Sequence, residues 1–209
     1  MLNNGDRVVP EPLLLGRNDA KLMSIAEDLG IDAYTTDYDS AIGSSEHALF
    51  FDAGTTVMRP ELLDQALSKG KHLYCEKPVA FSLASARKLC ARADAADVKA
   101  GVVMDKLFLP GLIKLGQLKT QGFFGRILSV RIDFGYWVFT GEESPSNRPS
   151  WNYRKSSGGG IILDMMAHWR YVLDRIVAPV HSVVCLGATH VDQRWDERGD
   201  AYTADAEDA

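Results

Sequence analysis

The sequence predicts an α/β fold in which a parallel sheet, with helices on both faces, is followed by a smaller α+β region. Up to about residue 104, short apolar runs alternate with amphipathic segments of helical length, as in strand-helix-strand units. Beyond that point the alternation stops, and longer apolar stretches and a polar loop take its place. We therefore expect two domains, residues 1–104 and residues 105–209.

The first predicted unit is a strand at 13–15 followed by a glycine and a helix. Gly16 ends the apolar run, and either Asn18 or Asp19 is a suitable helix N-cap. Gly30 is placed to end the helix. The positions expected to face the core are Leu22, Ile25, Ala26 and Leu29.

Further strands and helices are expected up to residue 104. The run 47–51 is apolar enough for a strand buried on both faces. Pro60 begins a helix that Gly70 ends, a strand follows at 72–75, and Ser82 caps the next helix. A short strand is expected at 99–104. The residues that the Ser82-capped helix should bury are Leu83, Ala86, Leu89, Cys90 and Ala93.

The second half is expected to mix helices with long strands. A helix at 109–119 precedes an alternating strand across 126–139, and a polar loop follows it. The glycine run 158–160 leads into a helix at 161–176, and the run 180–191 reads as another strand. Candidate core positions of the alternating strand are Ile127, Val130, Ile132 and Phe134.

Composition excludes several classes of protein. An apolar fraction of 46% is sufficient for a core, and the net charge of −5 is spread without the basic stripe that nucleic acids require. No apolar stretch approaches the ~20 residues of a membrane helix, and the N-terminus lacks the features of a targeting signal. We expect a cytoplasmic protein with no nucleic-acid or membrane partner and no metal. The spacing of Cys75, Cys90 and Cys185 favours reduced core thiols over a disulfide or a ligand set.

Glu76, Lys77 and Pro78 follow the predicted strand at 72–75. Taken alone, an acid and a base at a strand end form most simply a solvated pair. In open parallel sheets, however, ligands bind beyond the carboxyl ends of the strands, where Lys77 would lie. The position therefore makes Lys77 a candidate site residue.

Asp164 and His168 share one face of the helix predicted after the glycine run, because they are four positions apart. Tyr171 and Arg175 continue the same stripe. Such a stripe is ordinarily the solvent face of an amphipathic helix. A histidine that titrates near neutrality beside a carboxylate also suits general-base catalysis, so both interpretations remain open here.

Together, GKHLYCEKP at 70–78 and GGGIILDMMAHW at 158–169 resemble the Gfo/Idh/MocA oxidoreductases, the family of glucose-fructose oxidoreductase and inositol dehydrogenase. The resemblance covers the chain nearly end to end. It implies a partial Rossmann-type, doubly wound dinucleotide-binding domain at 1–104 and an incomplete α+β substrate and oligomerisation domain at 105–209. It also implies hydride transfer between NAD or NADP and a secondary alcohol of a sugar, polyol or related cyclic substrate.

The resemblance assigns roles residue by residue. Lys77 matches the lysine that hydrogen-bonds the reacting hydroxyl, and the bond between Lys77 and Pro78 matches a peptide that is often cis. His168 matches the base that takes the hydroxyl proton, with Asp164 as its partner on the helix. Glu76 is expected to shape the turn and the nicotinamide ribose region rather than to perform chemistry.

The chain departs from the family pattern in its cofactor cradle. The segment MLNNGDRVVPEP contains no GxGxxG, so the amides that would hold a pyrophosphate are expected to be missing, and both ends of the chain look cut. Gly16, Arg17 and Asn18 stand where an NAD enzyme usually places an acid on the ribose. An arginine there suits a 2′-phosphate and slightly favours NADP, although Arg17 is equally well explained as an exposed turn residue.

A polar loop carries the candidate substrate contacts. RPSWNYRK at 148–155 resembles one subgroup of the family, and its aromatic and basic residues could grip a sugar-like ring by stacking and hydrogen bonding. Core packing explains Phe134 and one tryptophan better than ligand contact does. The candidates are Trp151, Tyr153, Arg154 and Lys155.

Three functions are compatible with these features. The first is an NAD(P)-dependent sugar or polyol dehydrogenase, or a fragment of one. The second is an inactive truncated remnant or sugar-binding module, which the absent phosphate loop motivates. The third is an NAD-dependent glycoside hydrolase. We expect a homo-oligomer if the sheet is complete, and an unfinished sheet with exposed strand edges should also seek a partner or aggregate.

Overall fold

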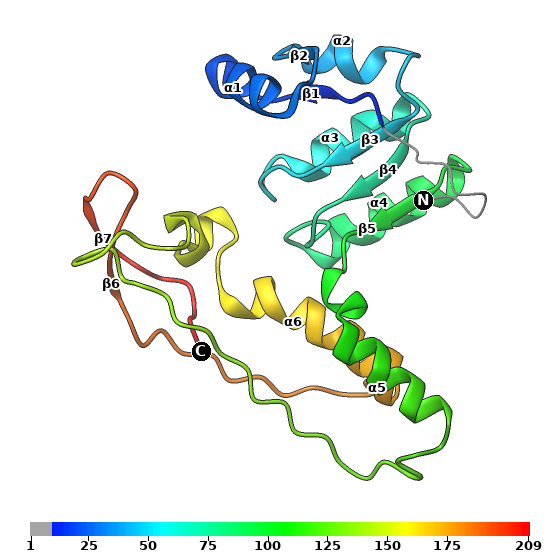
Figure 1. Cartoon of the computed structure of the whole chain (residues 1–209), viewed down its shortest axis with the longest axis vertical. Helices are drawn as coiled ribbons and strands as arrows, with labels where there is room; N and C mark the ends of the chain where they lie inside the picture. Colours follow the sequence, from blue (N-terminus) through cyan, green and yellow to red (C-terminus); the bar gives the residue numbers. More distant parts are fainter. Residues whose placement is uncertain (1–9) are drawn as a thin grey trace.

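Parallel strands joined by helices fill the first half of the computed structural model, which describes residues 10–209 (Figure 1). The expectation about a glycine-rich loop and an earlier strand falls largely on residues 1–9 and lies outside the described residues. The first pair is β1 (Leu13–Leu15) with β2 (Ala33–Thr35), and α1 (Asp19–Leu29) connects them. The first strand and the helix of this unit were predicted, but β2 was not, because the second strand was expected at 47–51.

The ends of α1 follow from local chemistry. The Asn18 side chain accepts a hydrogen bond from the backbone N–H of Lys21 at 3.0 Å, so Asn18 rather than Asp19 is the N-cap. Gly30 ends the helix with φ of 63°, a left-handed conformation that glycine adopts without strain. Leu22 and Ala26 are buried as predicted. The prediction that Leu29 faces the core is wrong, because 68% of its surface is exposed.

A second sheet follows, with strand order β3-β4-β5. It consists of β3 (Leu49–Asp52), β4 (His72–Cys75) and β5 (Ala100–Val102), all parallel. The connecting helices are α3 (Arg59–Ser68) and α4 (Leu83–Ala95). Ser82 caps α4 through the backbone N–H of Ser85, as predicted. Its face buries Leu89 and Ala93, whereas Leu83 and Cys90 are exposed, contrary to expectation.

The prediction that 47–51 is buried on both faces is wrong. Side chains alternate along β3 and β4, so that Leu73 and Cys75 face the helices while Leu49, Phe51 and Tyr74 are exposed at 54%, 53% and 43%. Within residues 10–209, the helices that contact this sheet cover the face on which Leu73 and Cys75 lie. The main core lies there and consists of Ile42, Leu63, Ala66, Leu67, Leu73, Cys75, Leu89 and Ala93.

One short helix was not expected from the sequence. The helix α2 (Tyr38–Gly43) contributes Ile42 to the core, and Asp37 caps it by accepting from the Ser40 N–H at 3.0 Å. The Asp-x-x-Ser spacing is a capping signal that could have indicated it.

Two helices organise the second half, on the side of the β3-β4-β5 sheet where β5 lies (Figure 1). A short 3₁₀ turn, η1 (Asp105–Phe108), leads into α5 (Pro110–Thr120), close to the predicted bounds. The predicted helix at 161–176 is α6 (Ile161–Val172), which continues as a π-helical turn, η4 (Leu173–Val177). The turn η1 packs against α6, and α5 packs against η4.

The strands predicted at 126–139 and 180–191 are wrong. Both segments are extended, but neither forms a hydrogen-bonded ladder within the part of the chain that the structure describes. Val130, Ile132 and Phe134 are exposed at 47%, 43% and 42%, and Val184 at 93%. A period-two pattern favours extended backbone, but a strand also requires a pairing partner.

The polar loop and the chain after the second extended segment pack on each other. The loop contains two 3₁₀ turns, η2 (Ser150–Tyr153) and η3 (Lys155–Ser157), and it faces an antiparallel pair, β6 (Gln193–Trp195) and β7 (Ala201–Thr203). The Tyr153 carbonyl accepts from the N–H groups of Asp205 and Ala206. These contacts fix the polar loop before α6 begins.

The cysteines and the helices bear on two further predictions. Cys75 is buried, and burial raises the pKa of its thiol to about 11, so it is an unreactive core thiol. Cys90 and Cys185 are free but exposed, so the expectation of core thiols is wrong for both. No helix in residues 10–209 combines the length and apolar character needed to cross a membrane.

Candidate functional site

Lys77 follows β4 and reaches across to α6. Its ammonium donates to the Asp164 carbonyl oxygen at 3.0 Å and pairs with the Asp164 carboxylate. The Lys77 side chain is 17% exposed, so the solvated-pair interpretation is wrong for this residue. The peptide bond between Lys77 and Pro78 is cis, as the family resemblance implied.

Asp164 lies in the first turn of α6 between two cations. Arg148 Nη2 donates to Asp164 Oδ2 at 2.7 Å and to Asn152 Oδ1 at 2.9 Å. Although burial raises the pKa of Asp164, the hydrogen bonds and charges of Lys77 and Arg148 lower it below its usual value. The carboxylate is therefore ionised at neutral pH and holds both cations beside the helix.

His168 lies one turn further along α6 and is only 4% exposed. Burial lowers the pKa of His168, and the nearby Lys77 charge lowers it further. The imidazole is therefore neutral near pH 7, which is the form that accepts a proton. The solvent-face interpretation is wrong for His168, while Tyr171 and Arg175 do lie exposed.

Arg59, a residue that sequence reasoning missed, holds the turn that carries Lys77 through a buried side chain. Arg59 is 1% exposed, and its guanidinium pairs with the Asp52 carboxylate at the end of β3. It also donates to the Gly54 carbonyl at 2.6 Å and to the Pro78 carbonyl at 2.5 Å. Glu76 belongs to the same turn, where its carboxylate accepts from the Lys77 N–H at 3.2 Å.

The glycine run is required by packing at the start of α6. Gly158 and Gly160 have φ of 74° and 116°, which favour glycine. A Cβ at Gly158 would lie 1.7 Å from the Phe81 ring, and one at Gly159 would lie 2.4 Å from the Asn152 carbonyl oxygen. The run therefore lets the polar loop, the segment after Pro78 and α6 approach closely enough to assemble the site.

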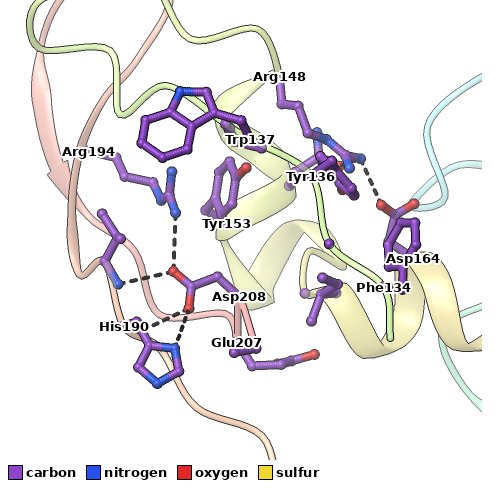
Figure 2. Close-up of a pocket in the computed structure, with 17 residues that line it drawn as sticks. Phe134, Tyr136, Trp137, Arg148, Tyr153, Asp164, His190, Arg194, Glu207 and Asp208 are labelled. Carbon is purple, nitrogen blue, oxygen red and sulfur yellow. Dashed lines mark hydrogen bonds and ion pairs between the residues drawn. The ribbon is translucent and has the colours of Figure 1, made fainter. Parts of the chain in front are cut away.

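A pocket of about 370 Å³ adjoins Asp164 (Figure 2). Aromatic residues of the first extended segment and polar residues of the loop and of the last residues of the chain form its wall. Arg194 stacks over the Tyr153 ring, 3.8 Å from the centroid, and donates to Asp208 at 3.1 Å. The lining includes Phe134, Tyr136, Trp137, Arg148, Asn152, Tyr153, Asp164, His190, Arg194, Glu207 and Asp208.

Only one of the four candidate substrate residues lies in the wall of this pocket. Tyr153 lines the pocket, whereas Trp151, Arg154 and Lys155 do not. The Arg154 guanidinium lies 4.0 Å over the Tyr202 ring, and the Lys155 N–H donates to Asp205 at 2.8 Å. Arg148, at the start of the same motif, reaches both the pocket and Asp164.

The candidate cofactor residues lie at the carboxyl ends of β1 and β4. Gly16 packs closely on α1, since a Cβ there would lie 3.2 Å from the Leu22 side chain. Asn18 is occupied as the N-cap, and Arg17 is exposed. Among residues 10–209, no three His, Cys, Asp or Glu side chains gather as a metal ion would require.

The parallel strands joined by helices form a Rossmann-type arrangement, a class of fold that binds ligands beyond the carboxyl ends of its strands. Residues 13–104 match the family described as "Oxidoreductase family, NAD-binding Rossmann fold", and residues 112–209 match the "GFO/IDH/MocA C-terminal domain". The chain belongs to the Gfo/Idh/MocA family of oxidoreductases.

Its relatives include named sugar and polyol dehydrogenases. D-xylose dehydrogenase of Paenarthrobacter nicotinovorans is 49% identical over 208 residues, which cover 100% of this chain and 54% of the relative. Myo-inositol 2-dehydrogenase of Thermotoga maritima is 25% identical over 205 residues, or 95% of this chain and 58% of the relative. The chain thus spans about half the length of the curated relatives it matches.

Solved structures share the fold. A levoglucosan dehydrogenase in complex with NADH and levoglucosan superposes with a TM-score of 0.80 at 21% identity, covering 95% of this chain and 52% of that one. At this identity, the likeness establishes the fold alone.

Proposed function

We propose that the protein is an NAD(P)-dependent dehydrogenase that oxidises a secondary hydroxyl of a sugar or polyol. The observation that carries the proposal is the pairing of Lys77, from the end of β4, with Asp164 on α6, beside the buried neutral His168. A base and a cationic donor are thereby brought to one place, as oxidation of an alcohol requires.

Each residue has a definite task in this proposal. Lys77 has three N–H donors, and two are used on Asp164, so the third can hold the substrate oxygen. His168 accepts the hydroxyl proton while the carbon gives up its hydride and becomes a carbonyl. Asp164, held by Arg148, keeps Lys77 in position. A bound nicotinamide supplies the two-electron acceptor.

Two features support a nicotinamide dinucleotide at the ends of the parallel strands. Gly16 permits the close turn after β1, and the turn of Glu76 and Pro78 lies beyond β4, where ligands of open sheets bind. Arg17 supports NADP because a guanidinium suits a 2′-phosphate. The structure of levoglucosan dehydrogenase holds NADH, which supports NAD, so both cofactors belong in the assay.

D-xylose is the first substrate to test, because the relative with that name is 49% identical across the whole chain. The pocket beside Asp164 supports a sugar, since Tyr136 and Trp137 offer ring faces and Arg148 offers donors to hydroxyl groups. Trp151, Arg154 and Lys155 lie outside that wall and remain predicted contacts.

Two organisational features complete the proposal. We place the boundary of a dinucleotide domain and a substrate domain at 104 and 105, which the separate family matches at 13–104 and 112–209 support. We also propose self-association, because Phe51, Tyr74 and Val184 present apolar side chains at 53%, 43% and 93% exposure.

The first test is substrate-dependent absorbance at 340 nm with D-xylose, myo-inositol and levoglucosan, each with NAD⁺ and NADP⁺, using the full-length protein. His168→Ala should lower kcat/KM by the ~10² to 10⁴ typical of losing a general base. His181→Ala, which alters an exposed histidine outside the pocket lining, is the matched control and should lose far less.

Unchanged turnover in His168→Ala would remove that residue from the mechanism. Titration with NADH and NADPH, followed by nicotinamide fluorescence, separates the alternatives. Failure to bind either cofactor would favour the remnant or sugar-binding module, and release of an aglycone without net absorbance change would favour a glycoside hydrolase.

A further inference from the structure

Asp105, the first residue of η1, faces the buried edge of His168. Its Oδ1 lies 3.5 Å from Nδ1 of the imidazole. Within residues 10–209, Nδ1 is a buried nitrogen without a hydrogen-bond partner, whereas Nε2 is not among the buried atoms that lack one. A buried ring nitrogen ordinarily has a partner, and the Asp105 carboxylate is an acceptor at 3.5 Å.

Asp105 lies beside Nδ1, and a hydrogen bond there would determine which imidazole nitrogen can act as a base. A neutral imidazole carries one proton, and the nitrogen that carries it cannot accept another. If the proton sits on Nδ1, Nε2 is free to take the hydroxyl proton. An acceptor beside Nδ1 stabilises that tautomer, and catalytic hydrogen bonds that are long without substrate commonly tighten when it binds.

We propose that Asp105 is a positioning residue that holds the Nδ1–H of His168, so that Nε2 faces the substrate hydroxyl. The inference rests on the proposed function and adds Asp105 to the set of Lys77, Asp164 and His168. It concerns a residue on η1, outside both motifs that carry the family resemblance.

The charges around His168 predict the direction in which its titration midpoint moves when each of them is removed. Lys77 after β4 and Lys106 on η1 disfavour the imidazolium, while Asp105 on η1 and Asp164 on α6 favour it. Lys106 Nζ donates to Asp105 Oδ2 at 2.8 Å, which leaves Oδ1 for His168. Removing Asp105 and removing Lys106 should therefore move the His168 titration in opposite directions.

The first measurement is the tautomer and titration of His168, from ¹⁵N shifts of the imidazole in the 209-residue chain. The wild type should carry its proton on Nδ1. Asp105→Asn keeps an acceptor and loses the charge, so the tautomer should persist while the midpoint moves to lower pH. Asp105→Ala should also lose the tautomer preference. Lys106→Gln should move the midpoint to higher pH.

The second measurement is kcat/KM against pH in the full-length protein. A base works only when unprotonated, so activity falls as pH drops through its pKa. The acid limb of the pH profile should therefore move to lower pH in Asp105→Asn and to higher pH in Lys106→Gln. Asp105→Ala should lose roughly 10- to 100-fold, part of the ~10² to 10⁴ a general base contributes. Asp133→Asn, an exposed carboxylate elsewhere, is the control and should move neither limb nor midpoint.

A wild-type proton on Nε2, or a His168 midpoint that Asp105→Asn leaves unchanged, overturns the role of Asp105 whatever the activity. An inactive wild type whose His168 shows the expected tautomer and shifts would defeat the proposed dehydrogenase instead, because the ring measurements need no substrate.

Discussion

At the scale of single residues, the site depends on pairs of charged groups that are buried or partly buried. Lys77 with Asp164, and Arg59 with Asp52, both join segments distant in sequence. Sequence reasoning found Lys77, Asp164 and His168 because they stand in recognisable motifs. It missed Arg59 and Asp105, because nothing in their neighbourhood indicates which partner each side chain meets, and it passed over Arg148 although RPSWNYRK begins with it.

The Arg59 network allows a prediction about stability. Arg59→Met leaves the Asp52 carboxylate buried without its cation and frees the Pro78 carbonyl, so we expect a loss of about 3 to 5 kcal/mol in the free energy of unfolding. Arg131→Met breaks a pair whose partners are 86% and 76% exposed and should cost less than about 1 kcal/mol. Urea unfolding measures both.

Equal losses in these two variants would contradict a buried anchor at Arg59. The double variant Asp52→Asn with Arg59→Met offers a further check. It should be less destabilised than the sum of the single changes, since neither partner is then left charged and alone.

At the scale of elements, prediction succeeded where the signal is local. A cap at Asn18 or Asp19, a cap at Ser82 and a helix end at Gly30 were expected, because a cap bonds to backbone within a few residues. The extended segments 126–139 and 180–191 were predicted as strands and are not paired. Whether a strand forms depends on a distant partner, which alternation within one segment cannot reveal.

The glycines that begin α6 give a prediction at the same scale. Gly158→Ala places a methyl group 1.7 Å from the Phe81 ring in a backbone with φ of 74°, so it should lower stability and displace Asp164 from Lys77. Gly116→Ala in the middle of α5, where a Cβ meets nothing within 4 Å, should stabilise by roughly 0.5 to 1 kcal/mol. Thermal unfolding followed by circular dichroism compares them.

Opposite signs in the two alanine variants are the essential result. If Gly158→Ala were as well tolerated as Gly116→Ala, the close approach of Phe81 to the glycine run would not be needed for the fold.

At the scale of the whole molecule, the exposed apolar surface predicts association. Leu49, Phe51 and Tyr74 lie together on β3 and β4, where the Phe51 and Tyr74 ring centroids are 5.6 Å apart. We expect the 209-residue chain to elute above its monomer mass in size exclusion with light scattering.

Phe51→Thr with Tyr74→Thr should reduce that association, because the two changes keep β propensity and remove apolar surface. Met23→Thr, a change of an exposed apolar residue on α1, is the control. A wild-type chain that stays monomeric at tens of micromolar would contradict the proposed self-association.

The contact between Lys77 and Asp164 spans 87 positions of the chain. A pairing that distant forms only after the intervening segment has been made and its ends brought together, at an entropic cost that nearer contacts do not carry. β4 and its neighbouring helices can take shape from their own local contacts, while the lysine beyond β4 has no carboxylate to meet until α6 exists. Neither half of the chain therefore brings the proposed catalytic residues together by itself. Catalytic activity would appear only once the whole chain has folded.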